Sequence, residues 1–247
     1  MSSNTTSFYS QLARPVKGIR QPVILALMLI LAGPVGIIGA QEVQINSNMV
    51  IEADGTLRMD NSATVWDDLM VYPDATTKGG SNPPVWGTTF KKNSTGTSQG
   101  VYLWMFAYNT EQELYYTVQI PHDYKVGSDI FPHVHWTTVT GTPSGSNVVW
   151  GLEYTIVAIG GSFPTTQTLQ SGSVISSIGT PSGTGQHLIN DFNAIDGTGL
   201  GISTVMVCRL YRAVTDPADT FPNAVGFLGF DIHYELDTQG SRQQWSK

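Results

Sequence analysis

Residues 130–138 read IFPHVHWTT, and this alternation of apolar and polar side chains indicates a β-strand. Successive side chains of a strand point to opposite faces, so Val134 and Trp136 share one face while His133 and His135 share the other. The bulky apolar side chains mark the face that packs on a core. We therefore expect the two histidines on the face that points away from that core.

The same two-residue alternation of apolar and polar side chains recurs near the C-terminus. In residues 226–237, Phe230, Ile232 and Tyr234 form an apolar face. The opposite face is expected to be exposed and to carry the acids of this strand: Asp231, Glu235 and Asp237.

Runs of this kind alternate with turn-forming residues along most of the chain. Eight segments are predicted as strands: 65–72, 85–90, 101–108, 114–120, 130–139, 147–159, 202–212 and 224–237. Residues 73–84 and 160–185 are predicted as loops, and only 187–195 is compatible with two helical turns. About eight strands without a long helix predict an all-β fold, an antiparallel jelly-roll-like β-sandwich over residues 65–247.

Charge is sparse and unevenly distributed over the 247 residues. Only 13% of the residues are charged, with 12 Lys and Arg against 19 Asp and Glu. Residues 1–40 carry three bases and no acid, whereas residues 41–247 have a formal charge of −10. Because phosphate contacts dominate nucleic-acid affinity, a body this acidic argues against binding to DNA or RNA.

Residues 1–40 form a basic and apolar N-terminal arm ahead of the sandwich. Three interpretations stay open: a secretory signal peptide, a membrane anchor through residues 22–40, or an apolar segment buried in an assembly. Gly33-Pro34 would interrupt a membrane helix midway. In the third interpretation the buried side chains are Val23, Ile24, Leu25, Leu27, Met28, Leu29, Ile30 and Leu31. Residues 41–64 follow as a connector, with one hairpin predicted at Asp54-Gly55.

His133 and His135 are the most specific candidates for chemistry. A His-x-His pair in a strand directs two imidazoles the same way, an arrangement that suits a transition metal, and His233 lies on a late strand as a third candidate ligand. With Gly127 the pair also matches the opening of the first cupin motif, but Val139 stands near where an acidic ligand should follow. Hydrogen-bonded histidines, or histidines at a subunit contact, are the alternative.

Several phrases taken together resemble a β-domain found in virion structural proteins of tailed phages. The resemblance covers about residues 65–247 and is carried by these segments: WDDL (66–69), KGGSNP (78–83), QIPH (119–122), PHVHW (132–136), WGLEY (150–154), DIHY (231–234) and GSRQ (240–243). Such domains sit behind unrelated N-terminal segments that dock them on the particle. The resemblance implies a virion location and carries over no established catalytic residues. No cofactor is expected, apart from a transition metal at His133 and His135 if they act as ligands.

The resemblance predicts that the chain is a non-enzymatic structural protein of a phage virion or similar surface assembly. Its expected partners are further copies of itself, as a homo-oligomer, and other virion proteins, with a cell-surface receptor or glycan as a further possible partner. Trp86 and Phe163 are candidates for stacking on a glycan, or else buried anchors of their loops. The alternatives are a secreted or membrane-anchored bacterial β-sandwich binding module and, third, a cupin-like metal-dependent enzyme.

Overall fold

The computed structural model describes residues 41–88, 90, 97–140, 146–171 and 185–247. Residues 42–247 form one compact unit. The predicted assembly segment and the rest of residues 1–40 lie outside the described residues. Within the described part of the chain, no helix is long and apolar enough to cross a lipid bilayer.

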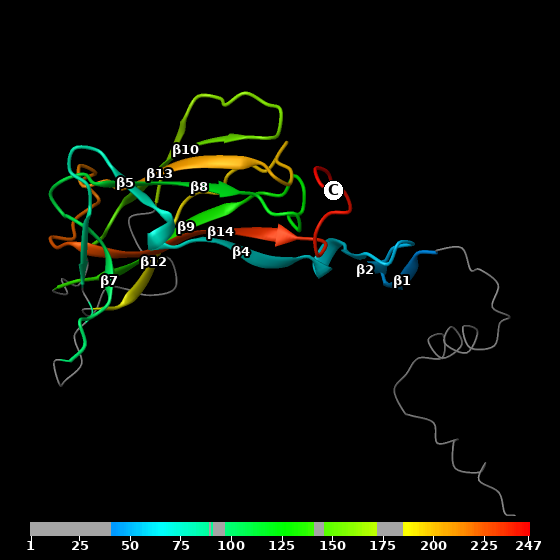
Figure 1. Ribbon diagram of the computed structural model, residues 1–247, viewed down its shortest axis with the longest axis horizontal. Coiled ribbons are helices and arrows are strands. Elements are labelled where there is room, and N and C mark those ends of the chain that lie inside the picture. The colour runs from blue at the N-terminus through cyan, green and yellow to red at the C-terminus, as the bar shows by residue number, and fades with distance from the viewer. Residues whose placement is uncertain (1–40, 89, 91–96, 141–145, 172–184) are drawn as a thin grey trace, which may run out of the picture. The chain divides into compact units, whose positions relative to one another are not determined.

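Two antiparallel sheets make up most of the described unit (Figure 1). The five-stranded sheet contains, in spatial order, β11 (Gln167–Gln170), β10 (Trp150–Val157), β13 (Val205–Arg212), β8 (Glu113–Gln119) and β5 (Thr77–Gly79). The six-stranded sheet contains β12 (His187–Asp191), β9 (Phe131–Thr138), β14 (Val225–Leu236), β7 (Tyr102–Phe106) and β6 (Val85–Thr88), with β4 (Val65–Val71) also paired to β14. A third, small sheet consists of β1 (Val43–Asn46), β2 (Met49–Ile51) and β3 (Leu57–Met59), and two 3-10 turns are η1 (Asn61–Ala63) and η2 (Pro73–Ala75).

The order of strands β7 to β14 is that of a jelly roll. Strands β7, β9, β12 and β14 belong to one sheet, and β8, β10, β11 and β13 belong to the other. The last strand, β14, lies between β7 and β9, while β13 lies between β8 and β10. Eight strands divided in this way between two sheets are the arrangement that two Greek keys produce. The predicted antiparallel jelly-roll-like β-sandwich is confirmed.

The core between the sheets is rich in aromatic side chains. Trp136 and Phe230 of the six-stranded sheet and Trp150 of the five-stranded sheet are fully buried. Phe106 meets Trp150 edge to face, with 5.0 Å between the ring centroids. Such a pair contributes about 0.5–1.5 kcal/mol beyond the burial of its area. The side chains assigned to the core by their alternation are the ones that the sandwich buries.

Each of the eight predicted strands overlaps an observed strand, and the differences lie in the connections. Residues 73–84 and 160–185, expected as loops, contain the short strands β5 and β11. The suggestion of helical turns in 187–195 is wrong, because β12 occupies its first five residues and pairs antiparallel with β9. This ladder satisfies backbone groups through a strand some fifty residues away, and such tertiary pairing overrides local propensity.

A β-bulge on β14 sets which side chains face outward. Phe227 lies opposite Trp136 and Gly229 lies opposite His135, so Leu228 is an extra residue on β14. Since a bulge adds one residue without a partner, Phe227 and Phe230 both face the core although they are three positions apart. Without the bulge the residues after Phe227 would alternate the other way and direct Asp231 into the core.

Candidate functional site

Cross-strand register assembles a polar cluster on the outer face of the six-stranded sheet. Asp231 of β14 lies opposite His133 of β9, and His133 in turn lies opposite Asp191 of β12. One row along, His233 of β14 lies opposite Phe131 of β9. Three strands far apart in the sequence, β9, β12 and β14, therefore place polar side chains on one surface.

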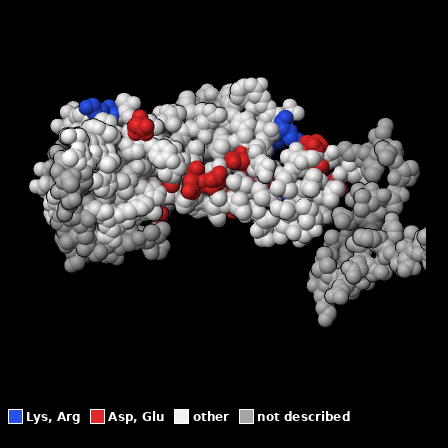
Figure 2. Space-filling model, turned by 60° about the horizontal axis from the view of Figure 1, so that its bottom comes forward, with Lys and Arg blue, Asp and Glu red and all other residues white. Residues whose placement is uncertain are grey.

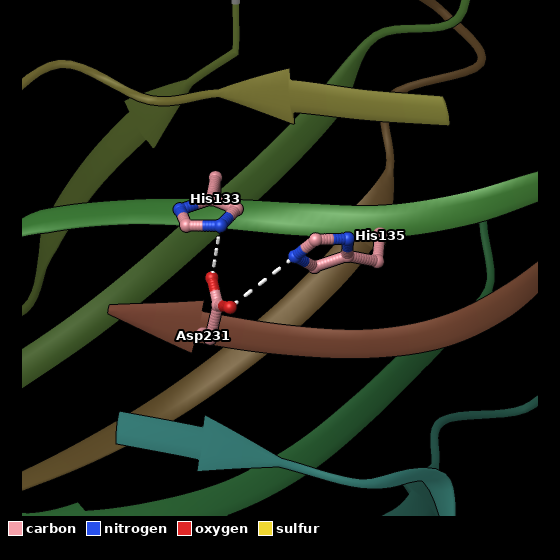
Figure 3. Close-up of side chains that lie close together, drawn as sticks. All are labelled: His133, His135 and Asp231. Carbon is pink, nitrogen blue, oxygen red and sulfur yellow. Dashed lines mark hydrogen bonds and ion pairs between the residues drawn. The ribbon is translucent and has the colours of Figure 1, made fainter. Parts of the chain in front are cut away.

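At the centre of the cluster two imidazoles converge on one carboxylate (Figure 3). His133 Nε2 contacts Asp231 Oδ1, and His135 Nε2 lies 3.2 Å from Asp231 Oδ2. The side chain of Asp231 is only 3% exposed, and those of His133 and His135 are 4% and 16% exposed. The prediction that Asp231 lines an exposed face is wrong, because the imidazoles of β9 cover its carboxylate.

Each of these imidazoles is also held at its second nitrogen. His133 Nδ1 lies 3.4 Å from the carbonyl oxygen of Phe131, and His135 Nδ1 lies 2.7 Å from Nε2 of His187. A carbonyl oxygen only accepts, so Nδ1 of His133 carries the hydrogen in its contact with Phe131. The two rings are therefore fixed in orientation, with Nε2 of both directed at Asp231.

The charges in the cluster shift its pKa values in the directions expected for an ion pair. Burial acts to lower the pKa of His133, but the hydrogen bond and negative charge of Asp231 outweigh it and raise that pKa above its usual value. Burial acts to raise the pKa of Asp231, but its hydrogen bonds to His133 and His135 lower it to about 2. Burial and then the nearby His135 lower the pKa of His187, which favours a neutral ring that accepts a hydrogen bond.

The three histidines singled out in the sequence come together, but not as one set of ligands. The ring of His233 lies 4.2 Å from that of His133, while its Nε2 pairs with Asp68 of β4 at 2.9 Å. The side chains of His233 and Asp68 are about half exposed. Sequence reasoning missed Asp231 and His187. Strand alternation across 187–191 would have placed His187 on the outer face.

A pocket of about 620 Å³ opens beside the cluster. Its aromatic wall is Trp66 of β4 packed edge to face on Phe131, with 5.3 Å between the ring centroids. Trp66 and Phe131 remain 56% and 38% exposed. The other lining residues are Pro132, His133, Asp191, Phe192 and His233. The pocket thus combines exposed aromatic faces with carboxylate and imidazole groups.

Comparisons with known proteins do not identify a function for this site. No protein-family model and no curated protein matches the chain. Among solved structures, TmCBM61 in complex with β-1,4-galactotriose is similar over 70% of this chain and 88% of its own, at 14% identity and a TM-score of 0.27. A superposition this loose carries no argument, so the fold rests on the strand order described above.

The sequence candidates for glycan stacking lie away from this pocket. Trp86 of β6 packs on Trp104, with 4.8 Å between the ring centroids, and stays 47% exposed. Phe163 follows β10 and is 55% exposed. The alternative that both rings are buried loop anchors is therefore wrong, and Trp66 is the exposed tryptophan that lines the pocket.

The position of the histidines differs from the cupin arrangement considered from the sequence. Cupin ligands face into the barrel, whereas here the space between the sheets is filled by aromatic side chains such as Trp136 and Trp150. His133 and His135 point from β9 to the opposite side, as their alternation with Val134 and Trp136 predicts. Any chemistry of the cluster therefore takes place on the outer face of the sandwich.

Proposed function

We propose that the sandwich is a non-catalytic binding module that takes a neutral glycan in the pocket beside Trp66. The observation that carries the proposal is the exposed Trp66–Phe131 pair at the wall of a pocket that also contains Asp191 and His233. The apolar face of a sugar ring packs on an aromatic ring, while carboxylate and imidazole groups hydrogen-bond its hydroxyls. Binding sites of this kind combine an apolar wall with a few polar groups.

The charge of the domain supports a neutral ligand. Residues 41–247 carry a formal charge of −10, and Asp68 and Asp191 lie at or next to the pocket. On the face shown in Figure 2, acidic side chains form a short row across a surface that is otherwise mainly uncharged. A polyanionic ligand would be repelled by this field, whereas an uncharged hydroxyl-rich ligand would not.

Replacing Trp66 with alanine is expected to weaken glycan binding at least about tenfold, because exposed tryptophans that contact a ligand commonly dominate its affinity. A glycan array of bacterial and plant polysaccharides identifies the class bound, and titration calorimetry with a matching oligosaccharide measures the affinity. Trp86→Ala serves as the matched control, since Trp86 is similarly exposed but lies on β6. Equal affinity of Trp66→Ala and wild type, or a loss with Trp86→Ala alone, would contradict the assignment of this pocket.

We further propose that the module is displayed on a surface assembly. The resemblance to phage structural proteins favours a virion as that assembly. The apolar run Val23–Leu31 would then bury its side chains against other subunits. A run of this kind exposed on a lone chain would form a large apolar patch, which soluble proteins avoid. The compact unit formed by residues 42–247 would be the part on display.

Deleting residues 1–40 is expected to leave a folded β-sandwich that no longer assembles or docks. Burial of the apolar run drives assembly at roughly 25 cal/mol per Å² of apolar area, whereas the core of the sandwich lies within residues 42–247. Native mass spectrometry and circular dichroism of both chains provide the measurement. A truncated chain that still forms the full assembly would remove the role proposed for the arm.

A further inference from the structure

The cluster of His133, His135 and Asp231 has the arrangement of a metal site, and of these three residues only His133 also lines the proposed glycan pocket. One nitrogen of each imidazole and one carboxylate oxygen lie within 4.8 Å of one another. A divalent ion bonded to nitrogen and oxygen at about 2.0–2.2 Å would replace the direct contact between His133 Nε2 and Asp231 Oδ1, with these two atoms moving apart to admit it. Two imidazoles and one carboxylate are also a known ligand set for transition metals.

The second nitrogen of each ring is held as metal ligands require. In metal sites the nitrogen that does not bind the metal donates its hydrogen to a fixed acceptor, and this contact orients the ring. Here the carbonyl oxygen of Phe131 faces Nδ1 of His133, and Nε2 of His187 faces Nδ1 of His135. Both rings therefore present Nε2 toward the same carboxylate.

The buried carboxylate of Asp231 needs a positive partner at this point, which either a proton on His133 or a metal ion can supply. With hydrogen on Nδ1, Nε2 of His133 directs a lone pair at the carboxylate of Asp231 unless a proton or a metal ion stands between them. The two side chains are 4% and 3% exposed, so water is a poor substitute. Desolvated negative charge of this kind is normally paired or coordinated to a metal.

We propose that His133, His135 and Asp231 bind one divalent transition-metal ion such as Zn²⁺ on the outer face of the six-stranded sheet. Three protein ligands leave the remaining coordination positions for water or an external ligand. His233 and Asp68 form a neighbouring group that shares Asp231. Their half-exposed side chains pair with each other, so they lie outside the proposed ligand set.

Metal titration of the full chain after removal of metal with a chelator tests the proposal. We expect Co²⁺ to produce visible absorption bands that saturate at one ion per chain, and Zn²⁺ to abolish them by displacement. This measurement uses the wild-type chain, so it does not depend on whether a variant folds. Absence of both the Co²⁺ bands and any Zn²⁺ binding heat would overturn the proposal.

Variants then identify the ligands. Asp231→Asn and His135→Ala should each weaken Zn²⁺ binding by at least about 10- to 100-fold, the loss that removal of even an outer-shell partner of a metal ligand produces. His122→Ala is the matched control, since His122 hydrogen-bonds Ser203 and Ser241 away from the cluster. Unchanged affinity in both ligand variants, or loss with His233→Ala but not with His135→Ala, would overturn the ligand set. The glycan pocket shares the side chain of His133 with this site, but Trp66→Ala tests the pocket without altering a proposed metal ligand, so failure of one proposal can be told from failure of the other.

Discussion

Replacing Asp219 with alanine is expected to lower the free energy of unfolding by about 3–5 kcal/mol, the cost of leaving a buried charge without its partner. Asp219 accepts two hydrogen bonds from Arg212, at 2.9 Å from Nε and 2.7 Å from Nη2. The two side chains are 2% and 0% exposed. The variant would keep the guanidinium in the interior with only carbonyl oxygens beside it.

The position of Arg212 explains why the effect reaches the whole sandwich. It ends β13, and its guanidinium also donates to the carbonyl oxygens of Phe221 and Asn223, which precede β14. Asp219 in turn accepts a hydrogen bond from the backbone N–H of Val149, just before β10. Nη1 of Arg212 also lies 3.5 Å from the carbonyl oxygen of Ala107, just after β7 of the six-stranded sheet, so the ion pair connects the β13–β14 loop to both sheets.

Urea denaturation of the variant and of Asp74→Ala gives the measurement. Asp74 is an exposed carboxylate in η2, so its removal should change the free energy of unfolding by less than about 0.5 kcal/mol. Similar small changes in both variants would show that the buried pair contributes nothing beyond a surface charge.

Alternation predicts the core well because burial on one face leaves a local pattern. Val134, Trp136, Phe230 and Ile232 could be assigned to the interior from their spacing alone, and all four are fully buried. The eight main strands follow from the same pattern. The arrangement of these strands in two sheets follows from their number and from the lack of a long helical pattern after residue 64, which are properties of that whole region rather than of one segment.

Only part of the candidate site could be predicted from the sequence, because the register between strands depends on residues far apart in the chain. His133 and His135 can be recognised as a His-x-His pair within one strand, whereas the sequence around Asp231 does not distinguish it from an ordinary surface acid of β14. Its burial depends on the alignment of β14 with β9, which the bulge at Leu228 sets. The contact of His187 with His135 needs β12 to pair with β9 as well. Neither of these strand pairings can be recognised from the sequence of the segment alone.

The buried ion pair and the pocket were missed for the same reason. Asp219 lies in a segment that reads as a loop, and nothing near it in the sequence indicates a buried partner. Trp66 and Phe131 are 65 positions apart, and their contact depends on both β4 and β9 pairing with β14. Exposed aromatic side chains are easily taken for core residues until the sheet order is known.

Replacing Asn190 with alanine is the second change expected to be strongly destabilising, by about 2–4 kcal/mol, because it leaves buried polar groups without partners. Asn190 of β12 is fully buried. Its side-chain oxygen accepts a hydrogen bond from Nε1 of Trp136 at 2.7 Å, and its amide donates to the carbonyl oxygen of Val148 at 2.9 Å. One side chain thus links β12 to β9 and to the segment that enters the other sheet.

A double-mutant cycle separates this polar linkage from the loss of packing. Trp136→Phe removes the indole N–H, so Asn190→Ala should cost about 1 kcal/mol less in that background than in wild type. Asn109→Ala, at an exposed position, controls for the loss of an amide. Equal costs of Asn190→Ala in both backgrounds would show that the Trp136 hydrogen bond contributes nothing. Because Asn190 lies next to Asp191 and holds the strand that carries His187, its loss should also displace two residues of the outer-face cluster. The stability of the interior and the geometry of the site are in this way set by the same edge strand.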